Sequence, residues 1–243
     1  MQIETENKTA LQSSGVPGSL TLGDSEIAVI GIDIGSTTAK IVVFCGEAGC
    51  PAGSGRLVYS CYERHFSQVR PKTLELLRRV QPLVGNRRVR VAISGSAGLG
   101  LARAANIPFV QEVFATAETV RRLEPDTSAV IELGGEDAKI IFFDGGLDER
   151  MNGTCAGGTG AFIDQMASLL QTDAGGLNEL AKNYQMIYPI ASRCGVFAKT
   201  DVQPLINEGA NKEDIAISIF QAVVNQTISG LACGKPIRGK VAF

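Results

Sequence analysis

The chain has 243 residues, of which 44% are hydrophobic, and its 23 basic and 25 acidic side chains give a net charge of -2. That length allows one large domain or two small ones with a sizeable core. A charge so close to neutral gives no reason to expect a nucleic acid or an anionic membrane as a partner. The 28 glycines exceed the usual share of about 7% and, without a G-X-Y repeat, indicate many tight turns.

The first 26 residues are rich in Thr, Ser, Gln, Asn and Gly and show no periodicity. They contain no apolar run of the kind found in a secretory signal. The longest apolar runs of the chain are too short for a membrane span. We therefore expect a flexible leader at 1–26 and a cytoplasmic protein. In a reducing compartment, metal or redox roles are better guesses than disulfides for the six cysteines.

Two later segments share one pattern: an apolar run that ends in a carboxylate, a Gly-containing turn and a second apolar run. They cover residues 32–44 and 131–143 and align without a gap at an offset of 99 residues, so that Asp33 falls on Glu132. The pattern predicts two β-hairpins with polar, Gly-rich tips. Identical residues at this offset include Gly35 and Gly134, Ala39 and Ala138, Lys40 and Lys139, and Phe44 and Phe143.

Strands and helices alternate through the rest of the chain, which predicts a mixed α/β architecture. A stripe of Ile215, Ile219, Val223 and Ile228 predicts the core-facing side of a long helix at 212–232. The remaining expected elements are strands at 57–62, 89–94 and 109–110 and helices at 71–83, 97–105, 112–123 and 157–170.

The last residues, 240–243, look like the counterpart of the strand at 89–94. Everything that the first repeat places after that strand is missing from the second, so we expect a second domain that is truncated at its C-terminus. The repeat predicts a first subdomain at 27–126 and a second, incomplete one at 127–243.

Two repeats related by a pseudo-twofold axis would bring the hairpin tips together across a cleft. Asp33 and Glu132 would then offer paired carboxylates to a hydrated Mg2+ ion, which prefers oxygen ligands. Backbone N–H groups and hydroxyls would bind phosphates, and Lys40 either adds positive charge or points into solvent. The sequence contains no Walker-type P-loop. The candidate nucleotide-binding residues are Gly35, Ser36, Thr37, Thr38, Lys40, Gly134, Gly135 and Asp137.

The simpler alternative is that each tip is an ordinary Gly-containing turn. A carboxylate at the same position in both copies favours phosphate binding instead. The two tips resemble the phosphate-binding hairpins of the acetate kinase, sugar kinase, Hsc70 and actin superfamily. This resemblance implies a duplicated actin-like (ribonuclease H-like) ATPase fold that binds ATP or ADP between two domains and couples closure to hydrolysis.

Two cysteines lie in Gly-containing surroundings. Cys155 precedes a predicted helix within the sequence Asn-Gly-Thr-Cys-Ala-Gly-Gly-Thr-Gly, and Cys194 follows 39 residues later, next to Arg193. A helix N-terminus or a nearby arginine stabilises a thiolate. Each cysteine alone could instead be a small buried apolar residue. A zinc site is a weaker alternative, since the chain has one His (His65) and no CxxC motif.

These segments resemble the activators of 2-hydroxyacyl-CoA dehydratases and the ATPase subunits of benzoyl-CoA reductase over residues of about 27 to 243. The resemblance implies that Cys155 and Cys194 bind one [4Fe-4S] cluster shared across a homodimer, with two thiolates from each chain. It also implies that ATP hydrolysis drives a low-potential electron from the cluster to a partner acyl-CoA dehydratase or reductase. The electron donor would be a ferredoxin or flavodoxin. We interpret Cys45, Cys50, Cys61, Cys233 and His65 as structural.

The second hairpin departs from the simplest members of this family, which usually carry Asp at the position of Glu132 and Gln at that of Glu136. Both acidic residues resemble the longer, fused members, in which the activator module begins a larger polypeptide. Glu136 could orient or deprotonate the attacking water. We therefore expect Asp33, Glu132 and Glu136 to be catalytic. A small-molecule kinase of the same fold and a non-enzymatic nucleotide switch or assembly protein are the alternatives.

Overall fold

The structure is a computed structural model that describes residues 26–47, 55–152, 157–191 and 195–243. The chain divides into two compact units, Met1–Ala115 and Thr116–Phe243, which we describe separately. The expected leader at 1–26 lies outside the described residues, apart from Glu26, with which the first strand begins.

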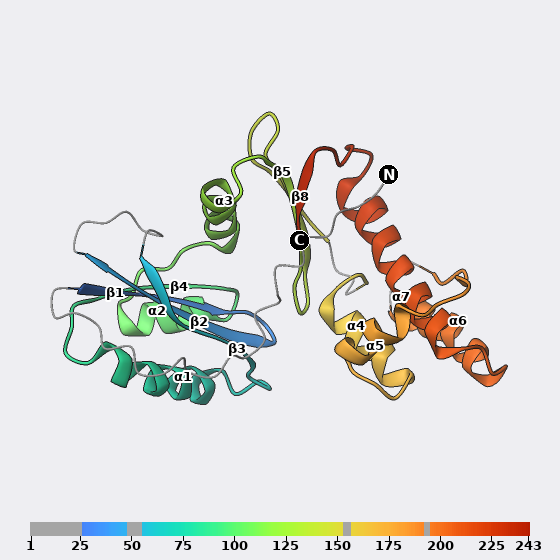
Figure 1. Cartoon of the computed structure of the whole chain (residues 1–243), viewed down its shortest axis with the longest axis horizontal. Coiled ribbons are helices and arrows are strands. Elements are labelled where there is room, and N and C mark those ends of the chain that lie inside the picture. The colour runs from blue at the N-terminus through green and yellow to red at the C-terminus, as the bar shows by residue number, and fades with distance from the viewer. Residues whose placement is uncertain (1–25, 48–54, 153–156, 192–194) are drawn as a thin grey trace. The chain divides into compact units, whose positions relative to one another are not determined.

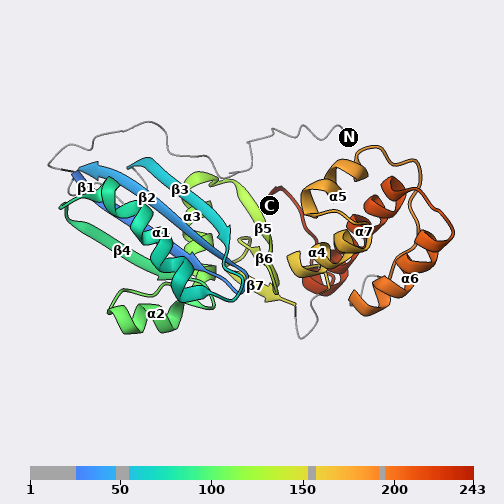
Figure 2. The same ribbon diagram turned by 90° about the horizontal axis from the view of Figure 1, so that it is seen from below.

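Unit 1 is a four-stranded sheet with helices packed on it (Figures 1 and 2). Helix α3 begins in this unit and ends in the next. The elements of unit 1 are β1 (Glu26–Ile34), β2 (Thr38–Glu47), β3 (Arg56–Arg64), α1 (Val69–Val84), β4 (Val89–Ser94), α2 (Gly98–Ala105) and α3 (Glu112–Leu123).

Unit 2 contains a second four-stranded sheet and a group of helices. Its elements are β5 (Thr127–Leu133), β6 (Ala138–Phe142), β7 (Asp148–Met151), α4 (Gly160–Leu169), α5 (Ala174–Ala181), α6 (Gly195–Asn207), α7 (Lys212–Gln226), the π-helix η1 (Thr227–Ala232) and β8 (Lys240–Ala242).

The two sheets have the same topology, with strand orders β3-β2-β1-β4 and β7-β6-β5-β8. In each, the first strand forms an antiparallel hairpin with the second and pairs in parallel with the fourth. Both predicted hairpins are therefore confirmed, and β8 lies beside β5 as β4 lies beside β1. The mixed α/β fold built from two repeats is as the sequence predicts.

The core of unit 1 lies between the sheet and α1, where Leu76, Val80 and Val84 meet inward-facing side chains of β1 and β2. Figure 2 shows α1 running along one face of this sheet. Alternate residues of β1, including Ile30 and Ile32, are buried, as expected of a strand with one face against a core.

Unit 2 has two clusters of buried side chains. One joins α4, α5, α6 and α7, with Met166, Leu177 and Ile219 fully buried. The other joins the sheet to η1 through Leu231 and Ile140. The hairpin strand β5 touches both clusters through Leu133, so the second hairpin is fixed between the sheet and the helices.

The prediction of the buried stripe on α7 was wrong at one residue, Ile228. Ile215, Ile219 and Val223 are buried, but Ile228 is 54% exposed and Leu231 is buried in its place. Ile228 lies five residues after Val223, about 140° around an α-helix, and so falls off the buried face. The π-helix that begins at Thr227 adds about one residue to a hydrogen-bonded turn and brings Leu231 onto that face.

The helix formed by α7 and η1, Lys212–Ala232, is long and apolar enough to cross a membrane by length and composition alone. Half of the apolar stretch is buried inside unit 2. Ile215 and Ile219 have no exposed surface there, as in the central helix of a helical cluster.

Candidate functional site

The first hairpin turns at Gly35, whose N–H donates to the carbonyl of Thr38 at 3.0 Å. Asp33 faces Lys40 across the hairpin, and the Lys40 ammonium lies 2.7 Å from the Asp33 carboxylate. Lys40 also lies over the ring of Tyr62, 5.4 Å from its centre. The Lys40 side chain is thus paired with Asp33 while remaining 35% exposed.

The second carboxylate oxygen of Asp33 accepts a hydrogen bond from the Ser94 hydroxyl at 2.9 Å. Ser94 lies opposite Asp33 because β4 runs parallel to β1. The next residue, Gly95, has a φ of +88°, and a Cβ there would lie 2.7 Å from the Asp33 carboxylate. Ser94 and Gly95 were not predicted as site residues. They could have been inferred from the end of the strand at 89–94, because the carboxyl ends of neighbouring parallel strands meet at one edge of a sheet.

The second hairpin repeats this arrangement. The Gly134 N–H donates to the Asp137 carbonyl at 2.7 Å, and a Cβ on Gly134 would come within 2.8 Å of that oxygen, so the turn requires glycine. Glu132 faces Lys139, with 3.9 Å between the ammonium and the nearer carboxylate oxygen. Lys139 is buried, whereas Glu136 is exposed at the tip.

The tip of the second hairpin is hydrogen-bonded to the first turn of α4. The Gly160 N–H donates to the Gly134 carbonyl at 2.8 Å, and the Ala161 N–H donates to the Gly135 carbonyl at 2.9 Å. A Cβ on Gly160 would lie 3.1 Å from the Gly134 oxygen, so the contact depends on a small residue. The fully buried Thr159 caps α4 just before this contact.

The predicted cluster ligands Cys155 and Cys194 lie outside the described residues, in the segments 153–156 and 192–194. Asn152, the last described residue before the first of these segments, is held by hydrogen bonds. Asn152 accepts a hydrogen bond from the Ala138 N–H at 2.8 Å through its side chain and donates its own N–H to the Ala138 carbonyl at 2.9 Å. Asn152 is therefore tied to the start of β6.

The chain on both sides of Cys194 is also fixed. The Ala191 N–H donates to the Asp201 carboxylate of α6 at 2.7 Å. Gly195 is the first residue of α6, and a Cβ there would collide with the Gln165 side chain of α4 and lie 3.7 Å from Phe162. The helix that follows Cys194 thus begins against the helix that follows Cys155.

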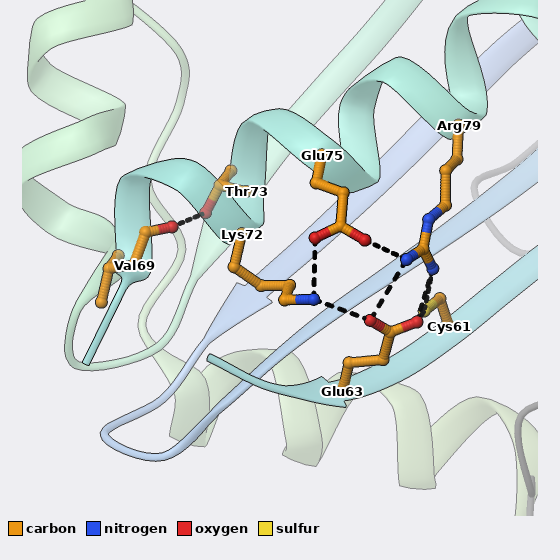
Figure 3. Close-up of polar contacts among 7 residues, drawn as sticks. All are labelled: Cys61, Glu63, Val69, Lys72, Thr73, Glu75 and Arg79. Carbon is orange, nitrogen blue, oxygen red and sulfur yellow. Dashed lines mark hydrogen bonds and ion pairs between the residues drawn. The ribbon is translucent and has the colours of Figure 1, made fainter. Parts of the chain in front are cut away.

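The cysteines that the structure describes form no disulfide bond: Cys45 is buried, Cys61 half-buried and Cys233 exposed. Cys61 donates to the Glu63 carboxylate at 3.1 Å, within the polar network that joins β3 to α1 (Figure 3). Burial, together with that acidic neighbour, raises the pKa of the Cys61 thiol. Within the described residues, no group of three or more His, Cys, Asp or Glu side chains is arranged to hold a metal ion.

His65 proves to be part of the first hairpin. Its ring is buried and lies 3.0 Å from the Gly35 carbonyl, and its backbone N–H donates to the Thr37 carbonyl at 3.1 Å. No sequence pattern predicts the hydrogen bond between His65 and Gly35, because His65 lies 30 residues beyond Gly35.

Two mixed sheets of the same topology, each with a Gly-turn hairpin, give the chain the fold of the actin-like ATPases. Residues 30–237 match the model of the BadF/BadG/BcrA/BcrD ATPase family. The chain belongs to this family.

Solved structures of activator proteins share the fold. The (R)-2-hydroxyglutaryl-CoA dehydratase component A of Acidaminococcus fermentans has a TM-score of 0.76 and 25% identity, over 88% of this chain and 81% of that one. The activator of the 2-hydroxyisocaproyl-CoA dehydratase from Clostridium difficile, solved with bound ADPNP, has a TM-score of 0.74 and 28% identity, over 88% of this chain and 78% of that one.

Among curated sequences, the 2-hydroxyisocaproyl-CoA dehydratase activator of Clostridioides difficile is 35% identical over 123 residues, which are 49% of this chain and 46% of that protein. The chain therefore spans a little under half the length of this relative in the sequence match.

Proposed function

We propose that the chain is an ATP-hydrolysing activator that carries a [4Fe-4S] cluster and passes a low-potential electron to a partner 2-hydroxyacyl-CoA dehydratase or a related reductase. One observation carries the proposal: the tip of the second hairpin is hydrogen-bonded to the first turn of α4, the helix that follows Cys155. A nucleotide-binding hairpin and a cluster-binding segment would thus be neighbours along one connected stretch of backbone.

Asp33 and Glu132 hold the Mg2+ ion in this proposal, since carboxylate oxygens suit this cation. In the structure each carboxylate has a lysine partner, Lys40 or Lys139. Lys40 would add positive charge beside the phosphates. Glu136, exposed at its tip, orients the attacking water. The phosphates would contact N–H groups and hydroxyls of Ser36, Thr37, Thr38, Gly135 and Asp137. Gly35 and Gly134 would shape the two turns, since their N–H groups already donate to the Thr38 and Asp137 carbonyls.

A structural change caused by phosphate release would be transmitted to the segment that contains Cys155 through α4. The carbonyls of Gly134 and Gly135 accept hydrogen bonds from the first N–H groups of α4, so a shift of the tip displaces the start of that helix. The segment with Cys155 connects directly to this end of α4, and α6, which follows Cys194, packs against the same helix. Hydrolysis can therefore bias a two-state arrangement of the helices.

Cys155 and Cys194 fit an iron–sulfur cluster by their chemistry. Cys194 directly precedes the first residue of α6, and a helix N-terminus favours the thiolate form, whereas Cys155 lies five residues before the first residue of α4. Two copies of the chain supply the four thiolates that such a cluster takes. When bound, the cluster supplies a one-electron carrier, while the chain's own residues bind the nucleotide and move the helices.

The proposal includes a homodimer, a ferredoxin or flavodoxin as electron donor and a partner acyl-CoA dehydratase or reductase. It also includes a cytoplasmic location, because a reducing compartment keeps the two cluster thiols available. We retain 27–126 and 127–243 as the ranges of the two ATPase subdomains.

The decisive experiment is to measure iron, sulfide and oligomeric state after anaerobic purification of the protein and of its Cys155→Ala and Cys194→Ala variants. We expect about four irons per dimer in the unsubstituted protein, as four-thiolate ligation requires, and loss of iron in both variants. Cys233→Ala is the matched control, since Cys233 is an exposed cysteine outside the proposed site, and it should keep its iron.

An iron-free protein that still hydrolyses ATP after anaerobic purification would contradict the cluster and favour a kinase or a nucleotide switch. Iron that survives both cysteine substitutions would place the cluster on other ligands. A protein that neither binds nor hydrolyses MgATP would overturn the nucleotide part of the proposal.

A further inference from the structure

His65 is the one histidine of the chain, and its imidazole is 97% shielded from solvent at the tip of the first hairpin. The Ser67 N–H points at Nδ1 at 3.1 Å. Since a backbone N–H can only donate, Nδ1 is the acceptor and the ring proton is on Nε2. Nε2 lies 3.0 Å from the Gly35 carbonyl, so it donates to that oxygen.

His65 therefore holds two carbonyls of the same tip: Gly35 through its ring and Thr37 through its backbone N–H. In a trans peptide the C=O and N–H groups point in opposite directions. The described chain has no cis peptide bond. The N–H groups of Ser36 and Thr38, which follow the two held carbonyls, consequently point away from His65.

The backbone around His65 is in an uncommon conformation. The Gln68 N–H donates to the His65 carbonyl at 2.7 Å and closes a turn. Both central residues, Phe66 at φ 47° and Ser67 at φ 62°, have positive φ, which normally calls for Gly, Asn or Asp in such a turn. Non-glycine residues are held this way where the surrounding structure requires it, often at functional sites. Here the turn brings the Ser67 N–H back onto the imidazole.

The second hairpin also has two tip carbonyls held by hydrogen bonds, but the donors are backbone N–H groups of α4. Its carbonyls at Gly134 and Gly135 are held by the N–H groups of Gly160 and Ala161. Gly134 is the repeat equivalent of Gly35, so the same carbonyl is held in both copies. In the first copy the imidazole of His65 takes the place of the helix N-terminus.

We propose that His65 is a positioning residue for phosphate binding: it holds the Gly35 and Thr37 carbonyls on one side of the tip, so that the Ser36 and Thr38 N–H groups face the phosphates of a bound nucleotide. Oriented N–H groups of this kind form an anion-binding site. The inference rests on the proposed function, because it assumes that this tip binds phosphate.

The test compares His65→Gln with His65→Asn by titrating each variant with MgADP in a calorimeter and by thermal unfolding without nucleotide. The Gln amide reaches roughly as far as Nε2 and can donate to Gly35, whereas the Asn amide is too short. One lost hydrogen bond predicts an affinity about fivefold to tenfold weaker for His65→Asn. For His65→Gln we expect a loss of about twofold or less.

Thr73→Val is the control for a general loss of a buried hydrogen bond. The Thr73 hydroxyl is buried in α1 of the same unit and donates to the Val69 carbonyl at 2.8 Å. This variant should melt at a lower temperature and bind MgADP with unchanged affinity.

If His65→Asn binds MgADP as tightly as the unsubstituted protein, the inference about His65 is wrong and the proposed function stands. This holds even if the melting temperature of the variant falls. Equal losses in the Gln and Asn variants would also contradict the inference, since only Gln can donate to Gly35. If the unsubstituted protein fails to bind MgADP, the proposed function fails, and the role of His65 fails with it.

Discussion

Glu63 holds the edge strand β3 to helix α1 through a small network of charges (Figure 3). Its carboxylate accepts hydrogen bonds from Arg79 and, at 3.0 Å, from Lys72, while Glu75 pairs with both of these bases. The hydrogen bonds from Arg79, Cys61 and Lys72 lower the pKa of Glu63 from 4.5 to about 2. The network thus stabilises the charged form of Glu63 in the folded protein.

Because the pKa of Glu63 is lower in the folded than in the unfolded chain, its contribution to stability is present above pH 4.5 and is lost as the pH falls towards 2. The side chain is 26% exposed, so solvent screening limits the contribution. Glu63→Gln should lower the free energy of unfolding by about 1 kcal/mol at pH 7 and make little difference near pH 2. Urea unfolding at several pH values measures this.

Glu179→Gln provides the matched control, because Glu179 also pairs with a lysine but is 67% exposed. It should leave the unfolding curve almost unchanged. A loss of stability for Glu63→Gln that is equally large at low and neutral pH would contradict the account, since such a loss would come from packing and not from charge.

At the scale of single residues, the repeat in the sequence predicted that Asp33 and Glu132, and likewise Lys40 and Lys139, occupy equivalent positions. It did not predict that each carboxylate faces its lysine across the hairpin, because that depends on the strand register. The contribution of His65 was missed for a related reason: its partner Gly35 is distant in the chain.

At the scale of elements, the change from α7 to η1 decides which side chains enter the core. At α-helical spacing Ile228 lies off the face formed by Ile215 and Ile219, and it is exposed. Leu231 instead packs with β5 and β6. A periodic pattern presumes an α-helix throughout, and a single π-helical segment moves the pattern out of phase.

Leu231→Ala should therefore lower the free energy of unfolding by about 2–4 kcal/mol, because it leaves a cavity beside the second sheet. Ile228→Ala, the control on the same segment, should change it by about 0.5 kcal/mol or less. Chemical unfolding followed by circular dichroism compares the two. A larger effect for Ile228 would mean that the segment buries a different face in solution.

The short elements of unit 2 were the hardest to predict. β7 has four residues and α5 has eight, and α6 contains Pro204. Elements of this length give little periodicity, and proline inside a pattern normally indicates a helix end. Contacts with β6, α7 and α4 stabilise them in the folded chain.

At the scale of the whole molecule, the proposed function assigns Asp33 and Glu132, one carboxylate from each repeat, to the same Mg2+ ion. The two sheets have the same topology, which makes these two carboxylates equivalent. We therefore expect Asp33→Asn and Glu132→Gln each to slow ATP hydrolysis by about 100-fold or more, and the double variant to be little slower than either.

Phosphate release from MgATP measures these rates, and thermal unfolding checks that the variants fold. Glu149→Gln, at an exposed position on β7, should keep the rate of the unsubstituted protein. Full hydrolysis by either Asp33→Asn or Glu132→Gln would contradict a site that both hairpins share. That the module begins a longer polypeptide stays a prediction of the sequence resemblance.

The sequence by itself determined the features that are written in consecutive residues. These include two hairpins 99 residues apart, a carboxylate before each Gly turn, and the family to which the chain belongs. Such features are local, since periodicity and turn chemistry act over a few neighbouring residues. Only the tertiary structure decided which distant groups meet: His65 on the Gly35 carbonyl, Ser94 on Asp33, and the start of α4 on the second tip. These contacts arise from sheet register and helix packing, which bring together residues that are tens of positions apart in the chain.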